Sequence, residues 1–432
     1  MKKLNGFLEE KMLPIAAKLG SNKVLISIRD GITLSMPLII IGSLFLVIAS
    51  FPVKAWTDWL ASTGINVYLV KGVDSSFGLM GLVASFGVAN SLARQHDVDG
   101  ISASIISLSS FIVLTPFISG EAGTGLPVGY MGSKGLFVAM IVGIISALIF
   151  KWFIKRDIQI KLPESVPPAV SRSFSALIPG AAIISLWLIV FIIVDKIGIG
   201  NIHDLMLIVL GGPLSLLGDN IFGTIIAILL NSLFWFVGIH GGNVVNSIIS
   251  PIWLMNSDAN RLIFQADKFV ELPHIITAQF IDNFVFIGGG GATIGLVIVI
   301  AIIARRKRAS QMSKTMLPLT LAPGIFNINE PAMFGLPIVM NISLLIPFVL
   351  APIANAVISY LAMASGIVAT TTGISVSWTM PPIISGFLTT GGHISGSILQ
   401  IVCIIVDVII YWFFYKSVEK QNLELELKED NK

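Results

Sequence analysis

Long apolar runs alternate with short polar segments along most of the chain. Each run holds about 20 residues, the length that an α-helix needs to cross the hydrocarbon core of a bilayer. The pattern therefore predicts an all-α polytopic membrane protein with about ten transmembrane helices. The expected spans lie at residues 32–51, 67–93, 101–118, 135–154, 174–194, 205–217, 221–239, 278–304, 336–361 and 395–415. The span at 205–217 is short and is interrupted by glycine and proline.

Composition supports this fold class and excludes a soluble enzyme. Hydrophobic residues make up 55% of the chain and charged residues 12%. A soluble domain carries about 25% charged residues. No basic patch is interleaved with aromatic residues, so we expect no nucleic-acid partner; lipid and a small-molecule substrate are the expected contacts.

The placement of positive charge predicts the topology. Most of the 27 Lys and Arg residues lie in five places, at 2–29, 94, 151–172, 305–314 and 416–432. Positive residues near span ends stay in the cytoplasm, so both termini are expected to be cytoplasmic. Residues 1–20 carry charges on both sides of their apolar positions. We interpret them as an amphipathic helix on the membrane surface rather than as a cleavable signal peptide.

A basic, proline-rich segment at 156–172 divides the chain. We expect N-terminal spans at 1–172, with a boundary that extends to about 200 if the fifth span belongs to them. A C-terminal transport part follows at 173–418, and a short charged cytoplasmic tail at 419–432.

Three segments of the C-terminal part are too polar for lipid and rich in Gly and Pro. They lie at 238–253, 321–337 and 378–396. Irregular backbone at membrane depth survives only where protein or a water-filled cavity satisfies it, and such breaks mark the binding sites of transporters. We expect the first two to form re-entrant hairpins that enter from opposite faces and meet near the bilayer middle.

Glu330 is the main candidate for the chemistry. A carboxylate in an apolar segment is costly in lipid, so it should face a cavity or a partner. Asn327 and Asn329 add amide donors and acceptors beside it. The functional interpretation is a carboxylate that accepts hydrogen bonds from ligand hydroxyls; the alternative is a carboxylate that only caps a helix N-terminus.

His240 lies among glycines in the first break, where a ligand or another backbone can approach closely. It is either a ligand-contacting or proton-handling residue, or a structural one. Asn243 and Asn246 follow as further candidate contacts. Nothing nearby has metal-ligand spacing, so we expect no metal and no cofactor.

Other candidates carry equally strong structural alternatives. Asp282 and Asn283 lie at the start of an apolar run and are either site residues or interfacial polar groups. Trp378 either stacks on a sugar ring or belongs to an interfacial belt. His393 either lines the site or is part of the loop structure. The glycine run at 288–291 indicates close packing or a locally unwound helix.

Four motifs carry a resemblance to a known family. They are GIHGGN at 238–243, DNFVFIGGGGAT at 282–293, GIFNINEPAMFGLPI at 324–338 and WTMPPIISGFL at 378–388. With them the chain resembles the sugar permease, enzyme IIC, of the lactose/cellobiose/diacetylchitobiose family of the bacterial phosphotransferase system. The resemblance covers nearly the whole chain.

The resemblance implies a multi-pass protein of the bacterial cell membrane. It implies a homodimer formed mostly by the N-terminal spans, and two re-entrant hairpins around a β-linked disaccharide such as cellobiose or diacetylchitobiose. By the matching motifs, Glu330 would hold the hydroxyl that is phosphorylated, with His240 close by.

The phosphoryl group itself would come from a cytoplasmic IIB partner, which bears it on a cysteine. The one cysteine here, Cys403, lies in an apolar run, and no soluble domain is expected after residue 432. The chain would thus be the membrane subunit of a phosphoenolpyruvate-dependent phosphotransferase complex with no phosphorylated residue of its own. The alternative is a proton-coupled secondary sugar transporter, with Glu330 or Asp282 binding the proton.

Overall fold

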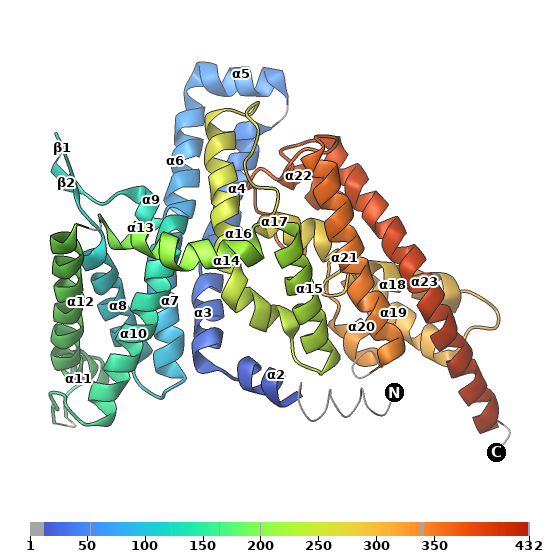
Figure 1. The fold of residues 1–432 in the computed structure, drawn as a ribbon, viewed down its shortest axis with the longest axis horizontal. Coiled ribbons are helices and arrows are strands. Elements are labelled where there is room, and N and C mark those ends of the chain that lie inside the picture. The colour runs from blue at the N-terminus through green and yellow to red at the C-terminus, as the bar shows by residue number, and fades with distance from the viewer. Residues whose placement is uncertain are drawn as a thin grey trace.

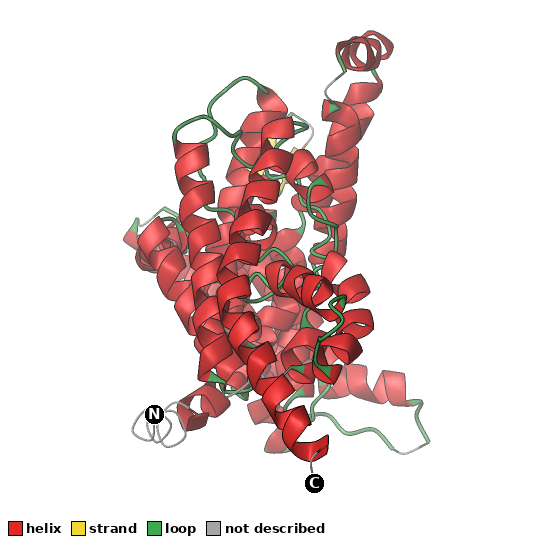
Figure 2. Ribbon diagram, turned by 90° about the vertical axis from the view of Figure 1, so that its right-hand side faces the viewer, coloured by secondary structure: helices red, strands yellow, loops and turns green. Residues whose placement is uncertain are grey.

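The computed structural model describes residues 13–51, 53–121, 123–163, 165–198, 200–336 and 341–430. Helices account for nearly all of the regular structure (Figure 2). One short antiparallel pair, β1 (Ile118–Gly120) and β2 (Gly123–Gly125), is the exception that the sequence pattern did not predict.

The N-terminal half is a bundle packed around two helices, α7 and α10 (Figure 1). The close approach of α3 to α7 needs a glycine, because a Cβ at Gly31 would lie 2.4 Å from the backbone nitrogen of Val88. Small residues play this role in membrane helices, where close van der Waals packing replaces the hydrophobic effect. The bundle helices are α3 (Lys23–Thr33), α4 (Met36–Ser50), α6 (Ile65–Phe77), α7 (Met80–Arg94), α8 (Gly100–Leu114), α10 (Leu136–Lys155) and α12 (Leu177–Ile197).

Shorter helices lie at the ends of this bundle. In Figure 1, α5 (Lys54–Thr63) crosses the upper end, whereas α2 (Leu13–Gly20) and α11 (Pro168–Ser175) lie at the lower end. Helix α2 covers part of the predicted amphipathic surface helix, whose placement on the membrane stays a prediction; residues 1–12 of it lie outside the described residues. Two one-turn elements, α9 (Val128–Met131) and η2 (Ser133–Gly135), lead into α10.

The C-terminal half consists of short, interrupted helices and a few long ones (Figure 1). Helix α21 packs against both α15 and α23, and α18 packs against α19 and α23. The elements are α13 (Ile202–Met206), η3 (Leu207–Gly211), α14 (Gly212–Gly218), α15 (Ile221–Phe236), α16 (Gly241–Ala266), α17 (Ala278–Phe280), η4 (Ile281–Val285), α18 (Ile294–Ala304), α19 (Gln311–Ile325), α20 (Glu330–Gly335), α21 (Ile342–Ala364), α22 (Ile384–Thr389) and α23 (Ile394–Asp430).

The structure confirms an all-α polytopic membrane fold, whereas the count of ten spans stays a prediction. Among the described residues, six helices are long and apolar enough to cross a membrane. A seventh results if Ile202–Gly218 and Ile221–Phe236 form one span, but the two meet at 78°. Two further apolar helices, α8 and α18, are shorter than a full span.

One predicted span is wrong as a continuous helix. Residues 278–304 contain a π-helical turn at η4 and an unwound segment, and only α18 resumes regular helix. The cause is the glycine run, in which Gly288, Gly289 and Gly291 adopt positive φ angles of 85°, 94° and 81°. The unwound helix expected at 288–291 is confirmed.

Two predicted boundaries also differ. The irregular part of the first break is confined to residues 237–240, because residues from Gly241 onward belong to the 26-residue helix α16. The hairpin is therefore formed by α15 and α16 around this short turn. At the other end, the tail predicted at 419–432 continues α23 without a break as far as the described residues reach, and its first residue, Glu419, is buried.

Candidate functional site

The second hairpin brings its polar tip to the unwound glycine run. Helix α19 ends at Ile325, and Asn327 then adopts a left-handed φ of 60° before α20 begins at Glu330. A Cβ at Gly289 would lie 2.8 Å from Cγ of Asn329. The bare backbone of the glycine run is thus what lets the hairpin tip pack against it.

Both asparagines at this tip bond to backbone. The Asn327 side chain accepts a hydrogen bond from the Gly288 N–H (2.8 Å) and donates to the carbonyls of Trp378 (2.7 Å) and Met380 (2.9 Å). The Asn329 side chain donates to the Gly290 carbonyl (2.9 Å). These bonds tie three segments together: the tip of the second hairpin, the glycine run and the 378–380 loop.

Glu330 differs from the two asparagines because part of its side chain is left open. The residue is half-buried, and its Oε2 atom is fully buried without a hydrogen-bond partner among the described residues. Buried oxygens are nearly always paired, so this oxygen at the hairpin tip is free to accept from a donor that arrives from outside the chain. A ligand hydroxyl is such a donor.

His240 is held in one orientation by its neighbours. It is the N-cap of α16, where its Nδ1 accepts a hydrogen bond from the Asn243 N–H (3.2 Å). Its ring packs on Trp235, with ring centroids 4.4 Å apart and planes at 47°. An Nδ1 that accepts must be unprotonated, so the ring carries its hydrogen on Nε2, which is left free to donate.

The hairpins that carry the two candidate centres share one tryptophan. The Trp235 ring packs on His240, the N-cap of α16. Trp235 lies between the two hairpins, since it also contacts Phe334 of α20 at 6.4 Å between centroids. An accepting side chain, Glu330, and a donating one, His240, therefore belong to two hairpins that meet at Trp235 in the C-terminal half.

Asn243 and Asn246 are both exposed, one helical turn into α16. Asn243 contributes its backbone N–H to His240. Asn246 lies beside the His240 ring, since a Cβ at Gly242 would be 3.3 Å from the ring Cε1 and 3.8 Å from the Asn246 amide nitrogen. Both asparagines thus remain candidates for ligand contact.

The remaining predicted site residues differ in their contacts with the hairpin tips. Trp378 is 52% exposed, and its carbonyl accepts a hydrogen bond from Asn327 at the hairpin tip, so it remains a candidate site residue. Asn283 is buried and donates its side-chain amide to the Gln279 carbonyl. Asp282 and His393 are exposed, and within the described residues no hydrogen bond joins either side chain to the hairpin tips. Their assignment as site residues stays a prediction.

Sequence reasoning missed two residues that shape the site. Trp235 lies in a plain apolar run and shows its role only through contacts with His240 and Phe334. Gln400 is buried in α23; its Oε1 accepts from the N–H groups of Ile383 (2.6 Å) and Gly386 (2.9 Å). A glutamine inside an apolar span was the available signal for the second.

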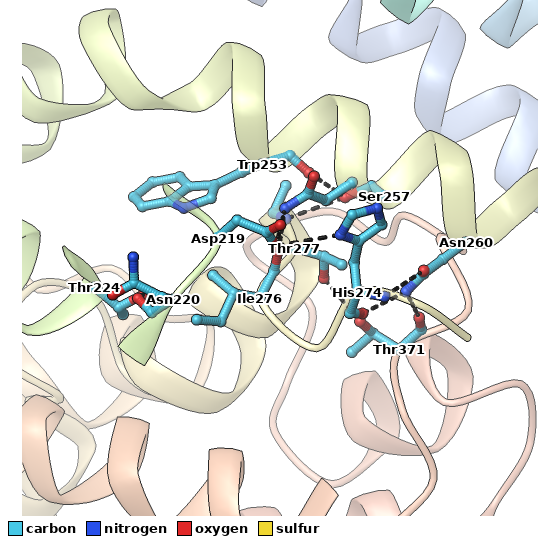
Figure 3. A network of polar contacts seen from close by, with 12 residues as sticks. Asp219, Asn220, Thr224, Trp253, Ser257, Asn260, His274, Ile276, Thr277 and Thr371 are labelled. Atoms are coloured by element: carbon cyan, nitrogen blue, oxygen red, sulfur yellow. Dashed lines mark hydrogen bonds and ion pairs between the residues drawn. The ribbon is translucent and has the colours of Figure 1, made fainter. Parts of the chain in front are cut away.

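A polar network at the far end of α16 fixes this helix, which begins at His240 (Figure 3). Asn260 bonds to the carbonyls of His274 (2.6 Å) and Thr371 (2.8 Å), and Asn256 bonds to Asp219 (2.9 Å). Side-chain amides here satisfy the backbone of loops that have no helical partners. The network thereby holds the hairpin that carries His240.

Apolar spans broken by two hairpins and an unwound run, with a polar centre where the breaks meet, define a polytopic membrane transport protein. Its family follows from comparison with known proteins. Residues 29–352 match the family described as "Phosphotransferase system, EIIC", and the chain belongs to this family.

Individual relatives agree with the family assignment. The chain is 44% identical to the lichenan permease IIC component of Bacillus subtilis (strain 168), over 99% of this chain and 96% of that protein. It is 44% identical to the cellobiose-specific EIIC component of Geobacillus stearothermophilus, over 96% and 94%. The crystal structure of the transporter ChbC, the IIC component from the N,N'-diacetylchitobiose-specific phosphotransferase system, matches with a TM-score of 0.90 and 42% identity, covering 97% of this chain and 99% of that one.

Proposed function

We propose that this chain binds a β-linked disaccharide, carries it across the membrane and presents it for phosphorylation by a cytoplasmic IIB partner. The relatives named for cellobiose, lichenan and diacetylchitobiose support the substrate class. The observation that carries the proposal is the buried, unpaired Oε2 of Glu330, on a hairpin that shares Trp235 with the hairpin carrying the His240 donor. Sugar hydroxyls are both donors and acceptors and match this pair.

The roles of the two residues follow from their hydrogen-bonding states. Glu330 accepts from the hydroxyl to be phosphorylated and orients its oxygen toward the phosphorus of the phosphocysteine on IIB. As the new O–P bond forms, the S–P bond breaks, the cysteine leaves as a thiolate, and the hydroxyl proton passes to Glu330 and then to water. His240 donates to a second sugar oxygen. Positioning of this kind is the main contribution a protein makes to phosphoryl transfer.

Uptake into vesicles tests the proposal. Labelled cellobiose or diacetylchitobiose should accumulate as the phosphate, and only with phosphorylated IIB present. Glu330→Gln should lower the rate by about a hundredfold or more, the lower range for loss of a positioned acid–base group. Glu271→Gln, at an exposed loop glutamate, is the matched control and should match the wild type.

The competing function, a proton-coupled secondary sugar transporter, predicts different results in the same assay. Unphosphorylated sugar would accumulate without IIB, and a proton ionophore would abolish the accumulation. Wild-type phosphorylation rates in Glu330→Gln would remove Glu330 from the mechanism.

We also propose that the chain lies in the bacterial cell membrane with both termini in the cytoplasm. The common placement of α2 and the end of α23 at the lower end of the molecule supports this topology (Figure 1). The N-terminal spans, 1–172, would form the contact of a homodimer, and 173–418 the transport part. Apolar side chains such as Ile101 and Ile105 stay exposed on α8 and are available for that contact. Cysteine cross-linking tests the dimer face. Cysteines introduced at these α8 positions should link two copies of the chain, whereas cysteines introduced on the exposed face of α23 should not.

A further inference from the structure

The side chain of Asn327 uses its hydrogen-bonding groups on two segments of the chain, the glycine run and the 378–380 loop. Its Oδ1 accepts from the N–H of Gly288, and its two amide hydrogens serve the carbonyls of Trp378 and Met380. An asparagine amide has two hydrogens to donate. Both are engaged within the protein, so neither is available to a sugar.

Both segments need an external partner for their backbone groups. Gly288 has a positive φ in an unwound run, and residues 378–380 form a turn outside any helix. Such groups lack the partners that a helix supplies, and leaving them unpaired at membrane depth is costly. Asn327 is 8% exposed, which keeps water from replacing it.

These bonds also set the position of a candidate sugar contact. Trp378 exposes its side chain but has its carbonyl bound by Asn327. The same hairpin carries Glu330, which directly follows Asn329 and precedes Pro331. One amide therefore ties the backbone of Trp378 to the hairpin that carries Glu330.

We propose that Asn327 is a positioning residue that holds the hairpin tip, the glycine run and the Trp378 loop in fixed positions relative to one another. It determines sugar affinity without touching the sugar. This inference rests on the proposed function, because it assigns Asn327 to the same disaccharide site.

The substitution Asn327→Asp tests the contribution of the two amide donors of Asn327. It is nearly isosteric and keeps the acceptor for the Gly288 N–H, but it replaces both donors with an oxygen that faces two carbonyls. We expect the KM for cellobiose phosphorylation to rise about tenfold or more at neutral pH, as loss of two hydrogen bonds implies, while kcat changes less.

The pH dependence separates this role from a general loss of structure. Lowering the pH protonates the introduced acid and returns one O–H donor, so the KM of Asn327→Asp should fall toward the wild-type value. Asn66→Asp, the same change at an exposed position of α6, should show neither the rise nor the recovery. An unchanged KM in Asn327→Asp, or a loss confined to kcat, overturns the proposal.

Hydrogen–deuterium exchange of the sugar-free protein gives a second readout. In Asn327→Asp, exchange should increase in the peptide around residues 376–382, which loses both donors, and less around 286–293, where the acceptor is kept. Equal exchange in both peptides contradicts the assignment. If this variant does not fold, Asn327→Gln replaces it: its donors sit on a longer side chain, so KM should rise without pH dependence.

The two proposals fail separately. Normal phosphorylation in Glu330→Gln rejects the proposed function, whereas the exchange pattern of Asn327→Asp needs no transport at all. Unchanged exchange with an inactive Glu330→Gln rejects the inference alone.

Discussion

Among single residues, Asn327 and Glu330 use one hairpin tip in opposite ways. Asn327 spends both amide hydrogens on backbone carbonyls, whereas Glu330 keeps a buried oxygen open. A paired polar group stabilises the protein itself, and an unpaired one raises the free energy of the empty site until a ligand satisfies it. The contrast separates residues that build the site from those that act on the sugar.

His240 combines both roles, and two substitutions separate them. Asparagine is also a good N-cap, so His240→Asn should keep the stability of α16 but lose the Nε2–H donor. His240→Ala loses the cap as well and should lower the free energy of unfolding by about 1 kcal/mol. Both variants should bind cellobiose about tenfold or more weakly in calorimetric titrations. Wild-type affinity in His240→Asn would show that the imidazole donor is not used.

The glycine run provides a test of close packing. Gly291 has a φ of 81°, and a Cβ there would lie 2.1 Å from Cδ2 of Phe348. Gly291→Ala should therefore lower the unfolding temperature strongly, because it adds this clash to the roughly 1–2 kcal/mol cost of a left-handed alanine. Gly366 has a similar φ of 73° but open space around it. Gly366→Ala should show the backbone cost alone, so equal losses would contradict the packing argument.

Residue types predicted where the backbone breaks better than which side chains pair across the breaks. Glycine, proline and carboxamide residues in apolar surroundings marked a break within 321–337, and the glycine run predicted close packing or an unwound helix at 288–291. The partners of Asn327, however, lie 39, 51 and 53 positions away in the chain. No local pattern shows which of two neighbouring polar side chains meets distant backbone and which stays open.

At the scale of elements, the second hairpin is fastened at its base as well as at its tip. Ser310 is the N-cap of α19, and the buried carboxylate of Glu419 accepts hydrogen bonds from its N–H and its hydroxyl, both at 2.6 Å. The hydroxyl of Ser313 donates to the same carboxylate (2.5 Å). A negative charge is favoured at a helix N-terminus. The last helix thus holds the start of the hairpin helix.

Glu419→Gln tests this fastening. The amide keeps one acceptor oxygen and turns the other into a donor that faces hydroxyl and amide hydrogens. Loss of a charge-assisted hydrogen bond should cost about 1.5–3 kcal/mol, measured by thermal unfolding in detergent. Glu424→Gln, in the exposed and weak pair with Lys420, is the control. A loss no larger than that of Glu424→Gln would show that Glu419 does not anchor α19.

Hydropathy predicted the helices correctly where apolar runs were regular. It failed where positive φ angles or an N-cap determined whether the chain is helical. The helices near 32–51, 135–154 and 174–194 are present. Residues 278–304 read as one span because the average over the window stays apolar, although positive φ angles interrupt the helix. Likewise, the polar residues of 241–253 suggested irregular backbone, but the N-cap at His240 starts a helix there.

In the whole molecule, an ionic cluster around the buried Arg261 joins the N-terminal bundle to the C-terminal half. Arg261 of α16 is 3% exposed, and its Nε donates to Asp258 (2.7 Å). Asp258 also accepts from the hydroxyl of Ser133 in the N-terminal bundle (2.6 Å), and Arg261 reaches Asp74 of α6 (3.4 Å). A second link runs from the Ser375 N–H to the Ser43 hydroxyl (2.8 Å).

Removing Asp258 should loosen the contact between the halves. Asp258→Ala takes away the closest carboxylate of the buried Arg261 guanidinium and leaves it the neutral Gln265 (2.7 Å) and the longer contact to Asp74 (3.4 Å). Breaking one partner of a buried pair costs about 3–5 kcal/mol. We expect a large drop in unfolding temperature in detergent. Asp58→Ala removes the exposed pair with Lys54 and should cost about 0–1 kcal/mol. Similar drops in both variants would show that the cluster does not hold the halves together.

Cys403 gives the chain an experimental property of its own. It is the one cysteine in 432 residues, and it is fully buried with its sulfur 3.5 Å from the Ser359 hydroxyl. Thiol reagents therefore have no accessible native target, and spin labels can be attached to introduced cysteines without first replacing a natural one. Labels at Ile248 on α16 and Ile325 on α19, both exposed, would report by electron paramagnetic resonance how far the two hairpins separate during a transport cycle.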